Sequence, residues 1–201
     1  MEELRGERIS IRGFTREEWH DFWRGYENDP LSGMSTSVYE ETACEKRYRR
    51  ALTQTMEHPR LGIFLPDGTP VGLLGLKGIN RDRGYCSFGI VMQNDSRKNQ
   101  GYGTEALRVL FAFVFEGMGL KRIYASTMGS NKRMQHLFTK LGFRYMDTNW
   151  AWFKLPDRRE DRLNYVLPRS ARDMRVRDYA FVRALPALAR NLRRKLRKET
   201  T

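Results

Sequence analysis

The feature of this sequence that most constrains its fold is a change of pattern between residues 85 and 118. Residues 85–92 read Tyr-Cys-Ser-Phe-Gly-Ile-Val-Met, a run that predicts a strand. From Thr104 onward the apolar residues recur every three or four positions, which predicts a helix that buries one face. These residues are Leu107, Leu110, Phe111, Val114, Phe115 and Met118. A glycine-containing loop joins the two segments, so strand, loop and helix are expected in succession.

The other segments predict six more strands and three more helices. Two helices are expected to begin at Thr15 and Ser37, because each hydroxyl residue is followed three positions later by Glu, the capping-box pattern. Another helix is expected from Met134 to Leu141. The strands are expected at residues 8–12, 61–65, 71–76, 122–127, 144–154 and 163–167. This order predicts an α+β fold, with a mixed, mostly antiparallel seven-stranded central sheet and flanking helices.

A chain of 201 residues suits one domain, which we expect to span residues 1–168. Residues 169–201 hold eleven Lys and Arg against three Asp and Glu; this net charge of +8 leaves +5 of the total +13 for the domain. An apolar stripe predicts that this extension is a basic amphipathic helix. The stripe consists of Leu185, Leu188, Leu192 and Leu196. RNA, the ribosome or an anionic surface would suit the basic face. A solvated face, or packing on the domain or on the second subunit of a homodimer, is the alternative.

The sequence lacks the signatures of several protein classes. Cys44 and Cys86 form no CxxC pair, and the three histidines show no metal-ligand spacing, so we expect no metal site. No apolar run is long enough to span a membrane, and five of the first eight residues are charged, unlike a signal peptide. We therefore expect a cytoplasmic protein.

The most specific motif is the segment Lys98-Asn99-Gln100-Gly101-Tyr102-Gly103-Thr104-Glu105-Ala106, which precedes the predicted helix. Glycines allow the backbone to turn tightly and approach a ligand, and a helix N-terminus presents unpaired N–H groups to an anion. A pyrophosphate would fit this loop, assisted by Arg97 and Lys98. Taken alone, the pattern is equally consistent with a tight turn that binds nothing, because it is neither a phosphate-binding P-loop nor a complete dinucleotide motif.

Two segments together resemble the GNAT superfamily of acetyltransferases. Residues 89–106, with Gly89-Ile90-Val91-Met92 and Lys98-x-x-Gly101-x-Gly103-x-x-Ala106, are similar to its motif A. Asn131 and the segment Leu137-Phe138-Thr139-Lys140-Leu141-Gly142-Phe143 resemble its motif B. The sequence of residues 101–107 is most similar to that of the RimJ/RimL-like branch. The resemblance implies a single GNAT-type domain that transfers acetyl from acetyl-CoA to a primary amine.

The resemblance also implies roles for individual residues. The strand edge at Ile90, Val91 and Met92 would pair with the pantetheine arm of acetyl-CoA, and an unpaired N–H there would stabilise the oxyanion. Asn131 would contact the same arm, or would only cap a helix. The pyrophosphate would be held by residues of the glycine loop. These are Arg97, Lys98, Asn99, Gln100, Gly101, Tyr102, Gly103 and Thr104.

Two positions depart from the family pattern. Many members carry a Tyr where this chain has Phe138, which cannot protonate the leaving thiolate. Many RimL-like enzymes carry a Glu where this chain has Ser87, which could at best position a water molecule. Ser87 is nevertheless the catalytic candidate, although the residue is equally consistent with an ordinary strand serine. Glu40 and Glu41 are alternatives that would equally well support a helix N-terminus.

Other functions are open at the level of sequence. A CoA-binding pseudoenzyme, or an RNA- or ribosome-associated module on the same fold, would explain the two departures and the basic extension. An aminoglycoside acetyltransferase is less consistent with a basic protein, because its substrate is cationic. Six aromatic residues at helical or strand spacing are expected in the core or in a pocket wall rather than in a base-stacking surface. They are Trp19, Trp23, Tyr26, Trp150, Trp152 and Phe153.

Overall fold

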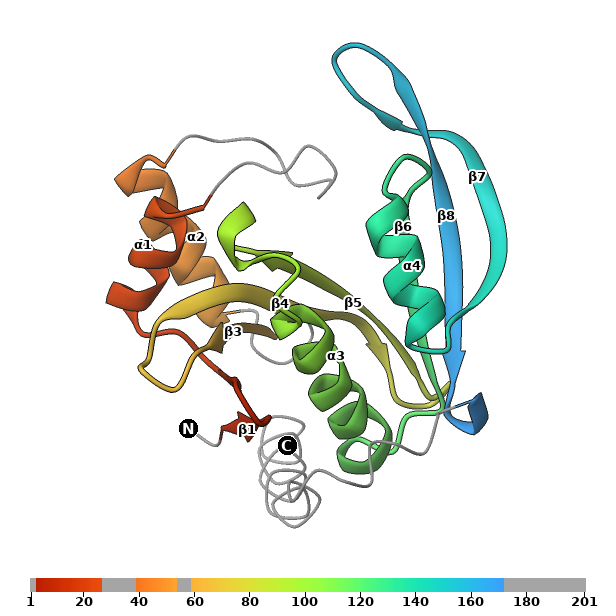
Figure 1. The fold of residues 1–201 in the computed structure, drawn as a ribbon, viewed down its shortest axis with the longest axis horizontal. Helices are drawn as coiled ribbons and strands as arrows, with labels where there is room; N and C mark the ends of the chain where they lie inside the picture. Colours follow the sequence, from red (N-terminus) through yellow and green to blue (C-terminus); the bar gives the residue numbers. More distant parts are fainter. Residues whose placement is uncertain (1–2, 27–38, 54–58, 172–201) are drawn as a thin grey trace.

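A computed structural model describes residues 3–26, 39–53 and 59–171 of the chain. The strands are β1 (Leu4–Arg5), β2 (Ser10–Arg12), β3 (Arg60–Phe64), β4 (Pro70–Asn80), β5 (Tyr85–Met92), β6 (Arg122–Met128), β7 (Arg144–Lys154) and β8 (Arg159–Pro168). The helices are α1 (Arg16–Arg24), α2 (Glu41–Thr53), α3 (Tyr102–Ala112) and α4 (Lys132–Lys140). The strands form one sheet in the order β1-β2-β3-β4-β5-β6-β8-β7 (Figure 1).

The sheet has eight strands rather than the seven expected. The extra strand, β1, contains only two residues, Leu4 and Arg5, which pair with Ile11 and Ser10 of β2. A two-residue strand leaves no periodic pattern in the sequence, so it could not be predicted. The α+β class and the mixed, mostly antiparallel sheet are confirmed, because only β5 and β6 pair in parallel.

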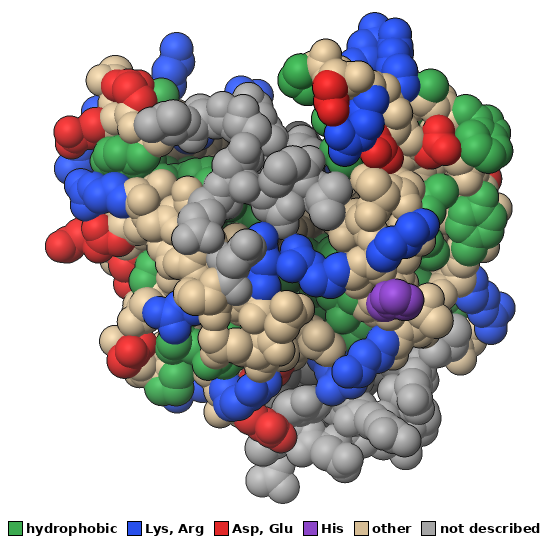
Figure 2. All heavy atoms as spheres, turned by 45° about the horizontal axis from the view of Figure 1, so that its top comes forward, with side chains coloured by type: hydrophobic (Ala, Val, Ile, Leu, Met, Phe, Trp, Pro, Cys, Tyr) green, Lys and Arg blue, Asp and Glu red, His purple; other side chains and the backbone are tan. Residues whose placement is uncertain are grey.

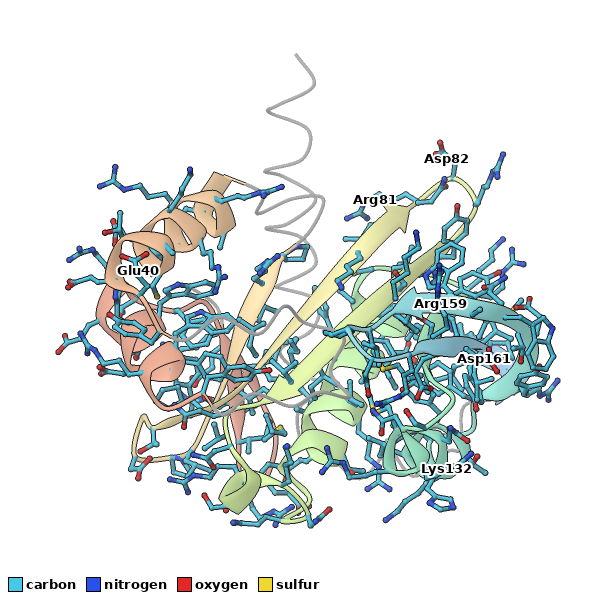
Figure 3. The ribbon with its side chains drawn as sticks, turned by 90° about the horizontal axis from the view of Figure 1, so that it is seen from above. Glu40, Arg81, Asp82, Lys132, Arg159 and Asp161 are labelled. Atoms are coloured by element: carbon cyan, nitrogen blue, oxygen red, sulfur yellow. The ribbon has the colours of Figure 1, made fainter. Side chains whose placement is uncertain are left out.

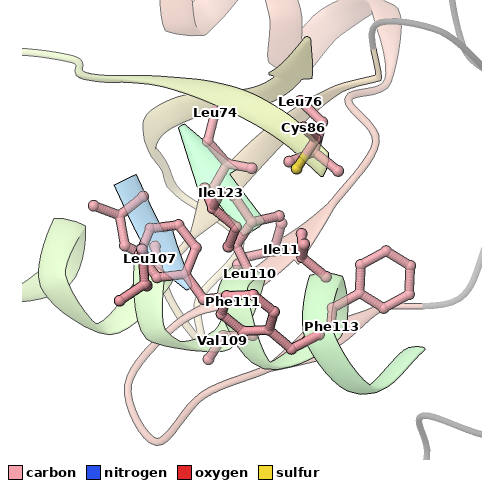
Figure 4. Close-up of a cluster of buried hydrophobic side chains, with 14 of the residues drawn as sticks. Ile11, Leu74, Leu76, Cys86, Leu107, Val109, Leu110, Phe111, Phe113 and Ile123 are labelled. Carbon is pink, nitrogen blue, oxygen red and sulfur yellow. The ribbon is translucent and has the colours of Figure 1, made fainter. Parts of the chain in front are cut away.

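Helices α1 and α2 lie on one face of the sheet, and α3 and α4 lie on the other (Figure 3). Leu74 of β4 lies on one face, in the core beneath α3 together with Ile11, Cys86, Leu110 and other buried side chains (Figure 4). Because successive strand residues point to opposite faces, the neighbouring Leu73 lies on the other face. There it packs among buried aromatic residues under α1 and α2. The sheet is therefore covered on both sides over β3 and β4.

The two predicted capping boxes have different outcomes. Thr15 caps α1 as expected: its hydroxyl accepts from the backbone N–H of Glu18, whose carboxylate accepts from the N–H of Thr15. The predicted start at Ser37 lies outside the described residues, and α2 begins only at Glu41. The Glu40 carboxylate accepts from the N–H groups of Thr42 and Ala43, so Glu40 supports this helix end.

The amphipathic helix after the glycine loop is confirmed, with altered ends. It begins at Tyr102, two residues before the expected start, and its α-helical part ends at Ala112. Phe113–Gly117 continues it as a π-helical turn, and Gly119, with φ of +71°, follows. Among the described residues, no helix is long and apolar enough to cross a membrane.

The prediction that these aromatic residues are buried or line a pocket is confirmed for Trp19 and Trp23 of α1 and wrong for Trp150 and Trp152 of β7. Trp19 and Trp23 are buried, whereas Trp150 is 78% exposed and Trp152 is 56% exposed. A bulge between Asn149 and Phe153 makes the difference, because Ala151 adopts φ of +49° and donates its N–H to the Asp161 carboxylate at 2.8 Å. β7 is also an edge strand, and Trp152 stays largely exposed although the Arg162 guanidinium lies 5.2 Å from the centre of its ring.

β8 ends at Pro168, and the division of the chain into a domain of residues 1–168 and an extension stays a prediction. Residues 172–201 lie outside the described residues, so the basic amphipathic helix stays a prediction.

Candidate functional site

The site is a cleft where two parallel strands separate. β5 and β6 pair only from Tyr85–Arg122 to Ser87–Tyr124, after which β6 remains paired with β8 alone. Beyond this point residues 88–92 of β5 and residues 126–128 of β6 line opposite walls of a cleft of about 510 Å³. The edge of β5 that faces β6 is therefore available to an extended ligand.

The glycine loop closes one end of this cleft. Gly101 adopts φ of +86°, a conformation that favours glycine, and Asn99 also has a positive φ of 61°. The N-cap residue of α3 is Gly101, and within the described residues the helix end has no side-chain capping hydrogen bond. Its first N–H groups therefore face the loop without a side-chain acceptor, as an anion site requires. The Nε atom of Arg97 is buried without a hydrogen-bond partner, which also points to an absent acceptor.

The N-terminal arm holds the glycine loop in place. The carboxylate of Glu105 is buried and accepts the backbone N–H of Arg8 at 2.8 Å and its Nε at 3.0 Å. Arg8 also donates to the carbonyl of Gln100 at 3.0 Å, and its guanidinium lies 5.2 Å from the centre of the Tyr102 ring. Arg8 thus connects residues on both sides of Gly101.

Residues of α4 also line the cleft, together with those of β5. Asn131 is the N-cap of α4, since its side-chain oxygen accepts the N–H of Met134 at 3.0 Å. The capping interpretation of Asn131 is therefore confirmed, and the residue also lines the cleft, where its ligand contact stays a prediction. Arg133 and Lys140 stand seven residues apart, two helical turns, and both line the same cleft.

The cleft is strongly cationic. Its lining contains five Lys or Arg residues and, within the described ranges, no Asp or Glu. The five are Lys77, Arg97, Lys98, Arg133 and Lys140. Figure 2 shows Lys and Arg side chains gathered across the hollow at the centre of one face of the molecule. A polyanionic ligand would match this charge.

The structure brings most of the predicted ligand-binding residues together. The predicted residues that line the cleft are Ile90, Val91, Met92, Arg97, Lys98, Asn99, Gly101, Gly103, Thr104 and Asn131. Gln100 and Tyr102 do not line it. The Gln100 amide donates to the carbonyl of Ser96, and Tyr102 packs under Arg8.

The catalytic candidates are less well placed. The Ser87 hydroxyl donates to the backbone carbonyl of Lys77 at 3.1 Å, and Ser87 is not part of the cleft lining. Phe138 lines the cleft but carries no acidic or basic group. Glu40 supports α2, as described above. No group of three or more His, Cys, Asp or Glu in the described parts of the chain could hold a metal ion.

Sequence analysis missed several cleft residues, of which Lys77 is the most notable. It follows six buried residues in β4, and a Cβ atom placed on Gly89 would lie 3.3 Å from its Nζ. A Lys that directly follows an apolar run within a strand is the signal that could have drawn attention to it. The basic residues of α4 could have been found from their spacing on one helix face. Phe153 also lines the cleft, in agreement with the expectation that it lies in the core or in a pocket wall.

Comparison with known proteins agrees with this arrangement. Residues 8–144 match the family described as an acetyltransferase (GNAT) domain. No curated protein matches the chain significantly.

Solved structures share the fold at low sequence identity. A RimL ribosomal L7/L12 alpha-N-protein acetyltransferase in complex with coenzyme A has a TM-score of 0.73 and 14% identity, covering 85% of this chain and 99% of that one. A GNAT-family acetyltransferase from Bacillus anthracis has a TM-score of 0.71 and 19% identity over 83% and 98% of the two chains. A putative ribosomal-protein-serine acetyltransferase from Vibrio cholerae has 0.69 and 21% over 83% and 97%.

Proposed function

The chain belongs to the GNAT acetyltransferase family, and we propose that it transfers acetyl from acetyl-CoA to a primary amine by direct attack in a ternary complex. The amine would be a peptide or protein N-terminus or a small amine. The observation that carries the proposal is the cationic cleft, in which an unpaired edge of β5 leads to the uncapped N-terminus of α3.

The residues of the cleft fit the cofactor of the family. The phosphates would lie at the glycine loop, near Arg97, Lys98 and the N-terminus of α3, because these groups offer positive charge and hydrogen-bond donors. The pantetheine arm would run along the edge of β5 from Met92 towards Gly89. When bound, acetyl-CoA supplies a thioester carbonyl, and a strand N–H would stabilise the charge that develops on its oxygen.

An amine attacks only when it is neutral, and this determines the best acceptor. At pH 7.2 about one α-amine in five is neutral for a pKa near 7.8, against roughly one lysine amine in 1,600 for a pKa near 10.4. Since Ser87 faces a backbone carbonyl and Phe138 has no ionisable group, the cleft offers no strong base at these positions. We infer that the acceptor is an α-amine, or another amine of low pKa, and that proximity supplies much of the rate.

Proteins of similar fold modify amines. One is described as an alpha-N-protein acetyltransferase and another as a spermidine N-acetyltransferase chimera. These descriptions support an amine acceptor and leave two chemical classes, peptide N-termini and polyamines.

Release of CoA thiol from acetyl-CoA, with and without an amine, tests the proposal. We expect release with a peptide that has a free N-terminus and much less with an Nα-blocked peptide that offers only a lysine side chain.

The Ser87→Ala variant should retain more than about a tenth of the turnover, and the rate should rise with pH as the acceptor deprotonates. A thousandfold loss in Ser87→Ala, or a preference for the lysine side chain, would refute this acceptor assignment. Tight CoA binding without amine-dependent release would indicate the alternative, a binding module.

A further inference from the structure

Two cations lie beside each other away from the glycine loop: Lys77 lines the cleft, and Arg60 lies next to it on the neighbouring strand, outside the lining. Lys77 of β4 stands opposite Ser87 of β5, and its Nζ atom lies over Gly89, as described above. Gly89 precedes Met92 by three residues, about 10 Å along the strand at roughly 3.3 Å per residue. The proposed phosphate-binding residues come after Met92. Lys77 is therefore not needed to hold the phosphates.

The second cation is Arg60, the first residue of β3. Arg60 pairs with Gly75, two residues before Lys77, so both side chains lie on the same face of the sheet. Burial and the charge of Arg60 lower the pKa of Lys77. Burial and the charges of Arg50 and Arg47 on α2 lower the pKa of Arg60. Lys77 and Arg60 therefore place two positive charges on one face of the sheet, of which Lys77 lines the cleft.

This cationic pair lacks a counter-ion. Within the described residues, the side chains of Lys77 and Arg60 take part in no ion pair or hydrogen bond. On the same face the neighbouring strands carry Ser87 of β5 and Tyr124 of β6, neither of which is a carboxylate, and Glu45 of α2 already has three partners. Both side chains remain exposed to solvent, but like charges side by side without an anion are unfavourable, and an anionic ligand would relieve the repulsion.

We propose that Lys77 and Arg60 form a carboxylate-binding subsite for the acceptor, and that the preferred acceptor is a peptide N-terminus with Asp or Glu at its second or third residue. This inference rests on the proposed acetyltransferase function. The subsite attracts an acidic acceptor and repels a polyamine, so it selects between the two classes of amine through both attraction and repulsion.

Competing peptides test the proposal on the full chain with saturating acetyl-CoA. Three hexapeptides would share an N-terminal Ser and differ only at the second and third residues, which are Asp-Glu, Gln-Gln or Lys-Lys. Spermidine serves as the polyamine. We expect kcat/KM for the acidic peptide to exceed that for the neutral peptide at least tenfold, and the Lys-Lys peptide and spermidine to be poorer than the neutral peptide. The preference should weaken as salt is raised, because salt screens charges.

Variants show whether these two residues cause the preference. In Lys77→Met and Arg60→Met the acidic-to-neutral ratio of kcat/KM should fall at least threefold. Lys77→Glu should invert the preference in favour of the Lys-Lys peptide, an outcome that a merely structural role would not produce. Arg81→Met is the matched control, because Arg81 lies in the turn between β4 and β5, outside the cleft lining (Figure 3). It removes one positive charge and should leave the ratio unchanged.

Equal kcat/KM for the acidic and neutral peptides would overturn the carboxylate subsite and leave the acetyltransferase function standing. A preference that is the same in Lys77→Glu and Arg60→Met as in the parent would overturn it as well. Absence of CoA release with every acceptor would instead refute the proposed function, and the subsite with it.

Discussion

Replacing Gly103 by Ala or Val tests the glycine loop most directly, because the free protein has room for the change. A Cβ atom at Gly103 would lie 3.4 Å from the Sδ of Met92 and 3.7 Å from the Cδ1 of Ile90, which are ordinary contacts. Gly101 is a poorer choice. It has φ of +86°, and its Cβ would lie 2.9 Å from the guanidinium of Arg8. Substitution there would disturb the fold and the ligand together.

The structure predicts opposite effects of Gly103→Ala on stability and on binding. Gly103 is the second residue of α3, where Ala is a better helix former by up to about 1 kcal/mol, so the free energy of unfolding should stay the same or rise. The new methyl group points into the cleft between Met92 and Ile90, where the cofactor would pass. We expect acetyl-CoA affinity to fall at least tenfold, about 1.4 kcal/mol, and further in Gly103→Val.

Isothermal titration with acetyl-CoA and chemical denaturation without it give the two quantities. Gly129→Ala is a matched control, because its Cβ would meet only ordinary contacts, the nearest at 3.7 Å, and Gly129 does not line the cleft. It should bind acetyl-CoA like the parent. If stably folded Gly103→Val binds acetyl-CoA as tightly as the parent does, the loop does not hold the cofactor.

Three further predictions concern other parts of the chain. Hydrogen bonds from Arg16, Arg49 and His20 lower the pKa of Glu45 from 4.5 to about 2, so this carboxylate stabilises the fold above pH 4.5 and loses its effect as the pH falls through 2. The melting temperatures of the parent and of Glu45→Gln should therefore converge as the pH is lowered over that range. Curves of melting temperature against pH that stay parallel would contradict the assignment. Burial raises the pKa of Cys86 to about 12, so iodoacetamide at pH 8 should modify it only after unfolding, as mass spectrometry can show; rapid modification of the native protein would contradict this. Deleting residues 183–201 should leave acetyl-CoA affinity unchanged and reduce salt-sensitive retention on RNA or anionic vesicles, and unchanged retention would remove the partner proposed for that segment.

Sequence reasoning predicted best the elements whose pattern is local. β5 spans Tyr85–Met92 as expected, and most residues of the glycine loop line the cleft, because a strand, two glycines and an amphipathic helix in succession leave few alternative structures. The Thr15 capping box is confirmed for the same reason. The interactions that define these features lie within a few residues of one another.

The errors arose where distant segments determine the environment of a residue. The alternation of Trp150 and Trp152 suggests a strand with a buried face, but it does not reveal that β7 is an edge strand or that a bulge redirects the side chains. Lys77 leaves only a weak signal in the sequence, a Lys after an apolar run, because its importance comes from Arg60, Gly89 and the separation of β5 from β6.

The contact between Arg8 and Glu105 has a consequence for the order of folding. The two residues are 97 positions apart, and contacts of such separation form late, because a long loop must close before they are made. The glycine loop is therefore not a self-contained local motif. A fragment that begins after residue 9 would retain both family motifs but lack the arginine that joins Gln100 to Glu105. We expect such a fragment to bind acetyl-CoA weakly even if its remaining strands pair correctly.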